Sequence, residues 1–488
     1  MTGGDITLNQ KSSVALAAGS WNRAEVIAQL STALDLTNGE ATGQSVRTCW
    51  IGMQIGLEIG LDKQALSDLY YCLLLKEIGA SAASPEIYET YQTDDLAFQR
   101  DFKTIEEGFL GIVNFLIAKT GIKSDLGQRF SKLAKLFTGD KIFSGEFIST
   151  RARRGEIIAK DLGFPDGVGE AIASIEEHWD GKGYPNGLKG DDIPLNARIA
   201  LLAQIIEAFY TKGDRKSAIQ EALNRSGRWF DPRLVSAFIR VSKNVDFWIN
   251  LCSKDLIKRI HLTAPSSLET PLCDNGFDNI ARRFGEIVDA KSNFTHGHSA
   301  RVAYYSELMG SYFGLKQGER RWLRRAALLH DLGKLGISNM ILDKPDQLND
   351  EEREAMRVHG LIAHPALTTI DVLNPMISHN ATLEGKAIDQ TRLTDRIIRI
   401  ADAFDALTTD RPWRPAMNVE TALETIESEI GETVDHQCVA ALQAVIGPLE
   451  SFHERFGEIF GPLSSQPSRE AEIALSVAHK SRNIVSGL

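Results

Sequence analysis

The stretch AALLHDLGKLGISNMILDKP, residues 326–345, is an apolar run that His330, Asp331 and Lys334 interrupt. An aspartate in an apolar run needs a partner, and histidine with aspartate is a ligand combination for divalent metals. Neighbours on a helix point about 100° apart, and Lys334, four residues after His330, shares its face. The stretch predicts a helix with a metal-binding pair, and a lysine within reach of a phosphate that the metal polarises.

The same pattern occurs 254 residues earlier, in YYCLLLKEIGASAASPEIYE at 70–89, where Lys76 and Glu77 replace the His–Asp pair. The segment 43–61 matches 297–315 at the same offset, and 196–214 matches 394–412 at an offset of 198. Three matches in the same order predict an internal duplication.

The apolar periodicity is helical almost throughout, as at Val302, Tyr305, Met309 and Tyr312. Alternating strand patterns are scarce, and 488 residues exceed the size of one core. We therefore predict an all-α protein with two tandem helical domains. The expected boundaries are a flexible N-terminus at 1–20, domains at 21–245 and 280–450, a linker at 246–279 and a tail at 451–488.

Charge and composition exclude several classes of protein. The net charge of −11 gives no electrostatic reason to bind nucleic acid or an anionic membrane. No apolar run reaches the length of a membrane span, and the first residues lack a secretory signal. Five cysteines without a CxxC motif favour reduced thiols. We expect a cytoplasmic protein without a membrane partner, and the sequence leaves a homodimer or a protein partner open.

Histidine is concentrated in the second half, where nine of the eleven lie after residue 295. His298, His359, His379 and Asp402 each fall near the end of a predicted helix. Taken singly, each histidine is more often a core or surface residue than a ligand. With His330 and Asp331 they form the set from which a metal site on facing helices would be built.

The longer stretch LLHDLGKLGISNMILDKPDQLNDEE resembles the HD-GYP branch of the HD phosphohydrolases. The resemblance implies an all-α fold of two tandem HD-type helical domains. These helical enzymes bind two or three metals, commonly iron or manganese, and many hydrolyse cyclic di-GMP. The resemblance implies that the metal ligands are His298, His330, Asp331, His359, His379 and Asp402. It also implies that Arg411 and Arg414, in the DRPWR run, lie near substrate phosphates together with Lys334.

The second half departs from the family pattern at three places. Ser378 stands where the first of two paired histidines is expected, and Phe294 replaces a glutamate, which argues against a third metal. The GYP loop is absent there. We expect one or two divalent cations, and the residues do not distinguish iron, manganese, nickel and zinc.

The first half shows the opposite loss. Its segment EEHWDGKGYPNGLKGDDIP at 176–194 keeps the loop, with Asp180, Gly181, Gly183, Tyr184 and Pro185. The ligand positions hold Gln44, Lys76, Glu77, Glu176 and Gln204 instead. The first half is thus predicted to be a pseudo-enzyme domain. Because two buried carboxylates are costly, we expect Lys76 to act as a built-in cation bonded to Glu77, Glu176 or Gln204.

The favoured function is a metal-dependent phosphodiesterase of HD-GYP type in bacterial signalling, acting on a cyclic dinucleotide such as cyclic di-GMP. Asp331 and Lys334 are the candidate catalytic residues, with the cations activating water for attack on phosphorus and Lys334 stabilising a phosphoryl oxygen. One alternative is a phosphohydrolase that acts on another nucleotide or phosphoester. Another is a catalytically silent module that senses a nucleotide or binds a protein.

Overall fold

The computed structural model describes residues 21–39, 43–105, 109–121, 129, 146–263, 271–357, 392–429 and 434–446. The predicted N-terminus at 1–20 and the tail at 451–488 lie outside these residues. So do His359, Ser378 and His379.

The described part of the first half is helical apart from one two-residue strand. Its elements are β1 (Trp21–Asn22), α1 (Arg23–Leu34), η1 (Asp35–Asn38), α2 (Gln44–Glu58), α3 (Lys63–Leu75), η2 (Ala80–Ala83), α4 (Ser84–Tyr91), α5 (Asp95–Phe102), α6 (Phe109–Lys119), α8 (Glu146–Asp161), α9 (Asp166–Ala173), η3 (Gly190–Asp192), α10 (Leu195–Lys212), α11 (Arg215–Asn224), α12 (Pro232–Val241), α13 (Val245–Leu251) and α14 (Leu256–Thr263).

The second half repeats this helical composition. Its described elements are β2 (Pro271–Leu272), α15 (Asp274–Asp289), α16 (His298–Tyr312), α17 (Gln317–Leu329), η5 (Leu332–Gly336), α18 (Asn339–Leu342), α19 (Asp350–Arg357), α22 (Leu393–Thr408), α23 (Val419–Ser428) and α24 (His436–Ile446). The prediction of an all-α fold is confirmed.

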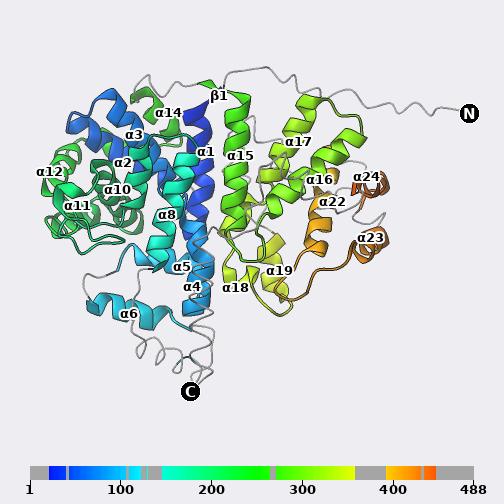
Figure 1. Cartoon of the computed structure of the whole chain (residues 1–488). Coiled ribbons are helices and arrows are strands. Elements are labelled where there is room, and N and C mark those ends of the chain that lie inside the picture. Colours follow the sequence, from blue (N-terminus) through cyan, green and yellow to red (C-terminus); the bar gives the residue numbers. More distant parts are fainter. Residues whose placement is uncertain are drawn as a thin grey trace, which may run out of the picture.

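The two halves meet along the helices that begin them. In Figure 1, α1 and α15 occupy the centre, most first-half helices lie to one side, and α16, α17 and α22 to α24 lie to the other. Strand β1 leads into α1 and pairs antiparallel with β2, which leads into α15. The Arg283 guanidinium of α15 also pairs with Asp161 of α8 at 2.7 Å. Buried apolar residues of both halves form one continuous core.

The segment predicted as a linker, 246–279, contains α14, most of α13, β2 and the beginning of α15. Its helices pack on the first half: the Trp50 indole of α2 donates to the Phe247 carbonyl at 3.1 Å, and the Tyr70 hydroxyl lies 2.9 Å from His261 Nε2. The boundaries of the two domains remain predictions.

Each half contains the same two polar contacts at equivalent positions. The buried Asp35 carboxylate accepts from the Ser45 amide at 2.9 Å, and Asp289 accepts from the Ser299 amide at 3.1 Å. These residues match at the offset of 254. Burial raises the pKa of both carboxyls to about 6. In both halves a buried aspartate therefore holds the beginning of the next helix.

The second contact is an ion pair. Arg47 Nε lies 2.7 Å from Glu207 of α10, and Arg301 Nε lies 2.5 Å from Asp405 of α22. These pairs match at the offsets seen in the sequence, so the repeated pattern corresponds to repeated contacts.

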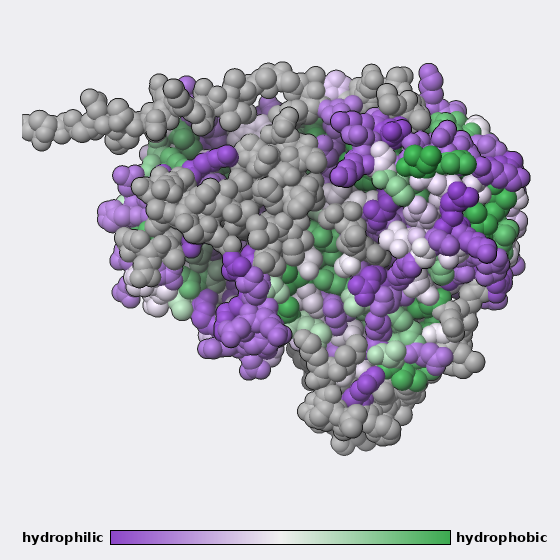
Figure 2. Space-filling model, turned by 180° about the vertical axis from the view of Figure 1, so that it is seen from behind, coloured by the Kyte–Doolittle hydropathy of each residue, from purple (hydrophilic) through white to green (hydrophobic). Residues whose placement is uncertain are grey.

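Hydrophilic side chains cover much of the surface on both halves in Figure 2, with hydrophobic ones between them. Among the described residues, no helix combines the length and the apolar character that crossing a membrane requires.

Candidate metal centre

The His–Asp pair lies at the end of a helix, not within one, which corrects the prediction. Helix α17 ends at Leu329, His330 is its C-cap residue, and Lys334 lies in η5. The His330 ring explains this end, because its Nδ1 is 2.7 Å from the Ala327 carbonyl and so binds a free acceptor of the last turn. Lys334 therefore does not follow His330 along a helical face, and its ammonium donates to the Asp331 carboxylate.

The other two described ligand candidates come from different helices. His298 is the first residue of α16, as predicted, whereas Asp402 lies inside α22 and not near its end. An interior position suits Asp402 because α22 packs against α16, so a side chain on the facing turn points at the beginning of α16.

These residues converge. His298 Nε2 lies 3.4 Å from Asp331 Oδ2 and 3.2 Å from Asp402 Oδ1. His330 Nε2 lies 3.4 Å and 3.8 Å from the same two oxygens. One donor atom each from His298, His330 and Asp402 fits within 4.8 Å. The predicted convergence is confirmed for the residues that the structure describes, and His359 and His379 lie outside them.

Asp405 was missed as a member of this site. Its Oδ2 is 2.7 Å from His298 Nδ1, and it also pairs with Arg301. A signal existed in the sequence: Asp405 follows Asp402 by three residues in the apolar segment IADAFDAL, so the two share a helix face.

Both imidazoles are held in one orientation by their Nδ1 atoms. The Ala327 carbonyl can only accept, so Nδ1 of neutral His330 carries the proton; the Asp405 carboxylate fixes His298 in the same way. Each Nε2 then faces Asp331 and Asp402. A carboxylate or carbonyl behind a histidine is the usual support for a metal-binding imidazole.

The electrostatics of the cluster favour positive charge between the two rings. Burial would lower the pKa of His298, but contacts with Asp331, Asp402 and Asp405 raise it well above its ordinary value. Burial would raise the pKa of Asp402, but the hydrogen bonds and charges of His298 and His330 outweigh burial. The pKa of Asp402 therefore falls well below its usual range.

Two cations bind carboxylates of this centre: Lys334 pairs with Asp331, and Arg301 pairs with Asp405. Asp331 and Asp402 also face the two histidines. Two oriented imidazoles and two carboxylates are a donor set that divalent metal ions accept, so the residues present fit a metal.

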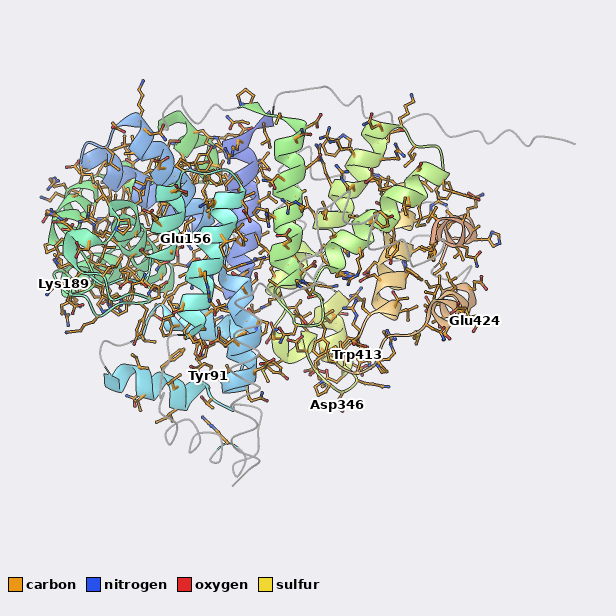
Figure 3. All side chains as sticks on the ribbon, in the orientation of Figure 1. Tyr91, Glu156, Lys189, Asp346, Trp413 and Glu424 are labelled. Atoms are coloured by element: carbon orange, nitrogen blue, oxygen red, sulfur yellow. The ribbon has the colours of Figure 1, made fainter. Side chains whose placement is uncertain are left out.

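The arginines of the DRPWR turn differ in what their side chains contact. The Arg414 guanidinium donates to the carbonyls of Ala406, Leu407 and Pro415 at 2.7–3.0 Å, so it closes the end of α22. Arg411 is half-buried and close enough to Lys334 to affect its pKa. Between them Trp413, labelled in Figure 3, is 49% exposed.

The equivalent position in the first half contains protein cations. Lys76 Nζ lies 2.8 Å from Glu77 Oε1, which confirms the expected bond between Lys76 and Glu77. Glu77 also binds Lys103 Nζ at 2.9 Å and Arg151 at 2.6 Å. Arg151 reaches Glu176 at 3.9 Å, and the Gln204 amide lies 3.4 Å from the same carboxylate.

The Lys76 and Glu77 side chains are fully buried. Burial would raise the pKa of Glu77, but Arg151, Lys103 and Lys76 together hold it well below its usual range. Gln44, at the position of His298, is buried, and within the described residues its amide atoms find no hydrogen-bond partner.

The predicted GYP loop packs tightly against the turn that follows α9. The Tyr184 amide donates to the Glu176 carbonyl at 3.0 Å, and a Cβ on Gly183 would lie 2.2 Å from the His178 nitrogen. The Tyr184–Pro185 peptide bond is cis, and Gly181 has a φ of 82°. Glycine is required at both glycine positions, for close approach at one and for the left-handed backbone at the other.

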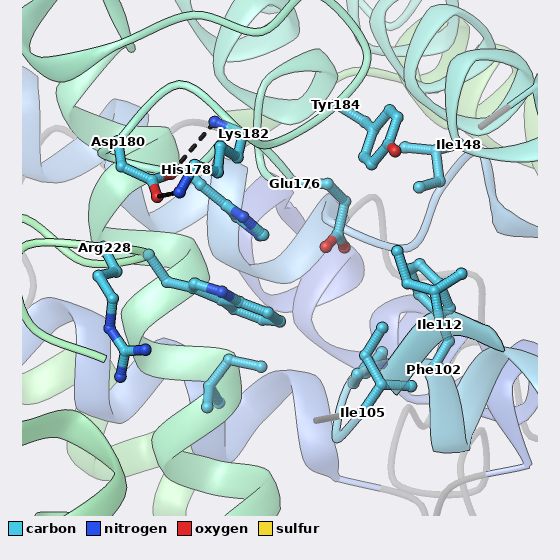
Figure 4. A pocket seen from close by; sticks show the side chains of 13 residues that line it. Phe102, Ile105, Ile112, Ile148, Glu176, His178, Asp180, Lys182, Tyr184 and Arg228 are labelled. Atoms are coloured by element: carbon cyan, nitrogen blue, oxygen red, sulfur yellow. Dashed lines mark hydrogen bonds and ion pairs between the residues drawn. The ribbon is translucent and has the colours of Figure 1, made fainter. Parts of the chain in front are cut away.

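A cavity of about 530 Å³ opens beside this loop. In Figure 4 the Glu176 carboxylate lies between His178 on one side and Tyr184 and Ile148 on the other. The His178 ring stacks on Trp229 with centroids 4.1 Å apart, and burial lowers the pKa of His178 to about 4.

Comparison with known proteins agrees with the arrangement of this site. The sequence pattern of the HD domain matches residues 139–234 and 283–438. The chain is 38% identical over 446 residues to the 3'3'-cGAMP-specific phosphodiesterase 3 of Vibrio cholerae, a match that covers 89% of this chain and 97% of the relative. It is 29% identical to the cyclic di-GMP phosphodiesterase response regulator RpfG of Xanthomonas campestris, over 36% of this chain and 49% of that protein.

Among solved structures, the crystal structure of a cyclic GMP-AMP specific phosphodiesterase of Vibrio cholerae superposes with a TM-score of 0.63 at 36% identity. The match covers 88% of this chain and all of that one. The chain therefore belongs to the HD-domain family of metal-dependent phosphohydrolases, in its HD-GYP branch. It is a metal-dependent phosphodiester hydrolase.

Proposed function

We propose that the second half hydrolyses a cyclic dinucleotide, and that 3'3'-cGAMP is the first substrate to test, with cyclic di-GMP second. The convergence of His298, His330, Asp331 and Asp402 carries this proposal. The order of substrates rests on the relative named for 3'3'-cGAMP, which aligns over nearly its whole length. The sequence alone had named cyclic di-GMP as the first candidate.

We assign the metal ligands within the described residues to His298, His330, Asp331 and Asp402. A divalent metal held there supplies an activated water and neutralises charge that develops on the phosphate. Asp405 and the Ala327 carbonyl keep the two imidazoles turned toward the centre. His359 and His379 stay predicted ligands, and the metal's identity stays open.

Lys334 is ion-paired with Asp331, so in this arrangement its first role is to hold that carboxylate. The Lys334 side chain is 18% exposed, and an ammonium carries three donor hydrogens, so others remain for a phosphoryl oxygen. Arg411 is the second candidate for the phosphate. The Arg414 guanidinium donates to backbone carbonyls, so it fixes the turn that carries Arg411 and does not bind the phosphate itself.

Elemental analysis combined with turnover tests the proposal. Protein purified without added metal should contain a divalent metal and should hydrolyse bis(p-nitrophenyl) phosphate, 3'3'-cGAMP and, more slowly, cyclic di-GMP. A chelator should abolish all three activities. Hydrolysis of the generic ester alone would favour another phosphoester as substrate, and metal-free protein that binds 3'3'-cGAMP without cleaving it would favour the silent sensor.

A further inference from the structure

A buried ion pair joins the two halves beside the metal centre. Asp95, the first residue of α5 in the first half, accepts from the Lys291 ammonium of the second half. The side chain of Asp95 is 0% exposed and that of Lys291 is 1% exposed. Lys291 also donates to the Ser84 hydroxyl of α4 at 3.1 Å. Removing one partner of a buried ion pair is strongly destabilising.

The Asp95 carboxylate holds a second segment as well. Its Oδ1 accepts from the Asn339 amide at 2.8 Å and from the Ser338 hydroxyl at 3.2 Å. Ser338 is the N-cap of α18. One carboxylate of the first half therefore binds two separate segments of the second half, one through Oδ2 and the other through Oδ1.

Each of these segments leads directly to the metal centre. Lys291 lies between Asp289, which binds the Ser299 amide, and His298, the first residue of α16. Ser338 and Asn339 follow η5, which begins immediately after His330 and Asp331. The Asn339 side-chain amide also donates to the Lys291 carbonyl at 2.6 Å, so the two segments are bonded to each other.

We propose that Asp95 is a positioning residue for the metal centre of the other half: it fixes the His298 segment relative to the His330–Asp331 segment. This rests on the proposed function of that centre. The first half, which has lost its own ligands, then contributes to the reaction through a carboxylate that the second half does not contain. Partners outside the ligand set commonly change metal affinity by about 10- to 100-fold.

Two variants separate positioning from simple charge balance. Asp95→Asn keeps the shape and one acceptor but leaves Lys291 buried without a counter-charge. Asp95→Asn combined with Lys291→Met removes both charges and keeps most of the lysine stem's volume. The matched control is Glu89→Gln, which removes the charge from an exposed contact across the same junction, where Asn293 Nδ2 donates to Glu89 at 2.9 Å.

We expect both Asp95 variants to bind Mn²⁺ about tenfold or more weakly than the parent apoprotein in titrations. At saturating Mn²⁺, kcat for bis(p-nitrophenyl) phosphate should fall while KM stays within about twofold, because Asp95 acts on the ligands and not on the substrate. Thermal melts of the metal-free proteins report folding. The double variant should melt near the parent temperature even where Asp95→Asn does not, and Glu89→Gln should match the parent throughout.

Wild-type Mn²⁺ affinity and kcat in the folded double variant would overturn the inference, since Asp95 would then only balance the charge of Lys291. Failure of both variants to fold would overturn it too, because the residue would be needed for the fold itself. A parent protein that binds no metal would instead reject the proposed function, and the inference with it. Metal binding without turnover in the parent would reject the function alone, and the titrations would still decide the role of Asp95.

Discussion

The two halves keep the same supporting contacts around centres of opposite chemistry. In both, a buried aspartate binds the beginning of a helix and an arginine pairs with an acid on the helix opposite. At the first centre, Lys76, Lys103 and Arg151 surround Glu77. At the second, His298 and His330 face Asp331 and Asp402.

The difference shows how a metal site can be lost without losing the fold. A buried cluster of carboxylates needs positive charge, and in an enzyme of this family a metal supplies it. In the first half three basic side chains supply it permanently, because Lys76 occupies the position of a ligand and Lys103 and Arg151 reach the same carboxylate. The first half is therefore expected to be indifferent to metal, and the second half to depend on it.

The largest effect is expected at the functional centre. Asp331→Ala should abolish hydrolysis of bis(p-nitrophenyl) phosphate and leave the helical circular-dichroism spectrum unchanged, because it removes a ligand candidate and spares the core. The loss should exceed the roughly 100-fold that supporting residues can cost. Full activity in this variant would indicate a contaminating hydrolase.

The equivalent substitution in the first half should affect stability. Glu77→Gln removes the carboxylate charge that Lys76, Lys103 and Arg151 share. Removing one partner of a buried ion pair lowers the free energy of unfolding by about 3–5 kcal/mol. Urea unfolding measures it, and adding a chelator should not change the difference between parent and variant. A difference that vanished with the chelator would mean that the first half binds metal after all.

The difference in stability between the parent and the Glu77→Gln variant should depend on pH. The pKa of Glu77 lies well below its ordinary value of 4.5 in the folded protein. The stability it contributes is thus fully present above pH 4.5 and is lost as the pH falls through the lowered value. We expect the free-energy difference between parent and Glu77→Gln to be constant from pH 6 to 5 and to shrink in more acidic buffer; a constant difference down to the acid transition would contradict the pKa shift.

Asp405→Asn should weaken metal binding by about 10- to 100-fold, because the amide no longer fixes His298 by charge. Isothermal titration of the apoprotein with Mn²⁺ measures this. Glu207→Gln, at the equivalent position of the first half, is the matched control and should leave the affinity for Mn²⁺ unchanged. Equal losses in the two variants would show that both act through general destabilisation.

The smallest effect is expected from the DRPWR turn. Arg411→Gln should raise KM for 3'3'-cGAMP by about tenfold, which corresponds to one hydrogen bond to a charged group worth about 1.5 kcal/mol. Arg414→Gln should instead lower the melting temperature, since its guanidinium binds helix carbonyls. Steady-state kinetics and thermal melts of both variants test this division; an increase in KM only for Arg414→Gln would reverse it.

The sequence by itself determined the class of fold, the duplication and the four ligand candidates that lie in the described residues. Helical periodicity is a local property, and the repeated segments kept their order. His330–Asp331 and the Lys76–Glu77 replacement could be recognised because an isolated charge in an apolar run requires a partner. The built-in cation followed from that requirement.

Tertiary structure alone decided which partners each charge found. Helix α17 ends at Leu329 because the ring of the next residue, His330, binds a carbonyl of that helix, which periodicity does not reveal. Lys103 and Arg151 meet Glu77 from segments 26 and 74 residues away, and Asp95 meets Lys291 across 196 residues. Such contacts depend on how the helices pack, because residues distant in the chain become neighbours only when the two halves share one core.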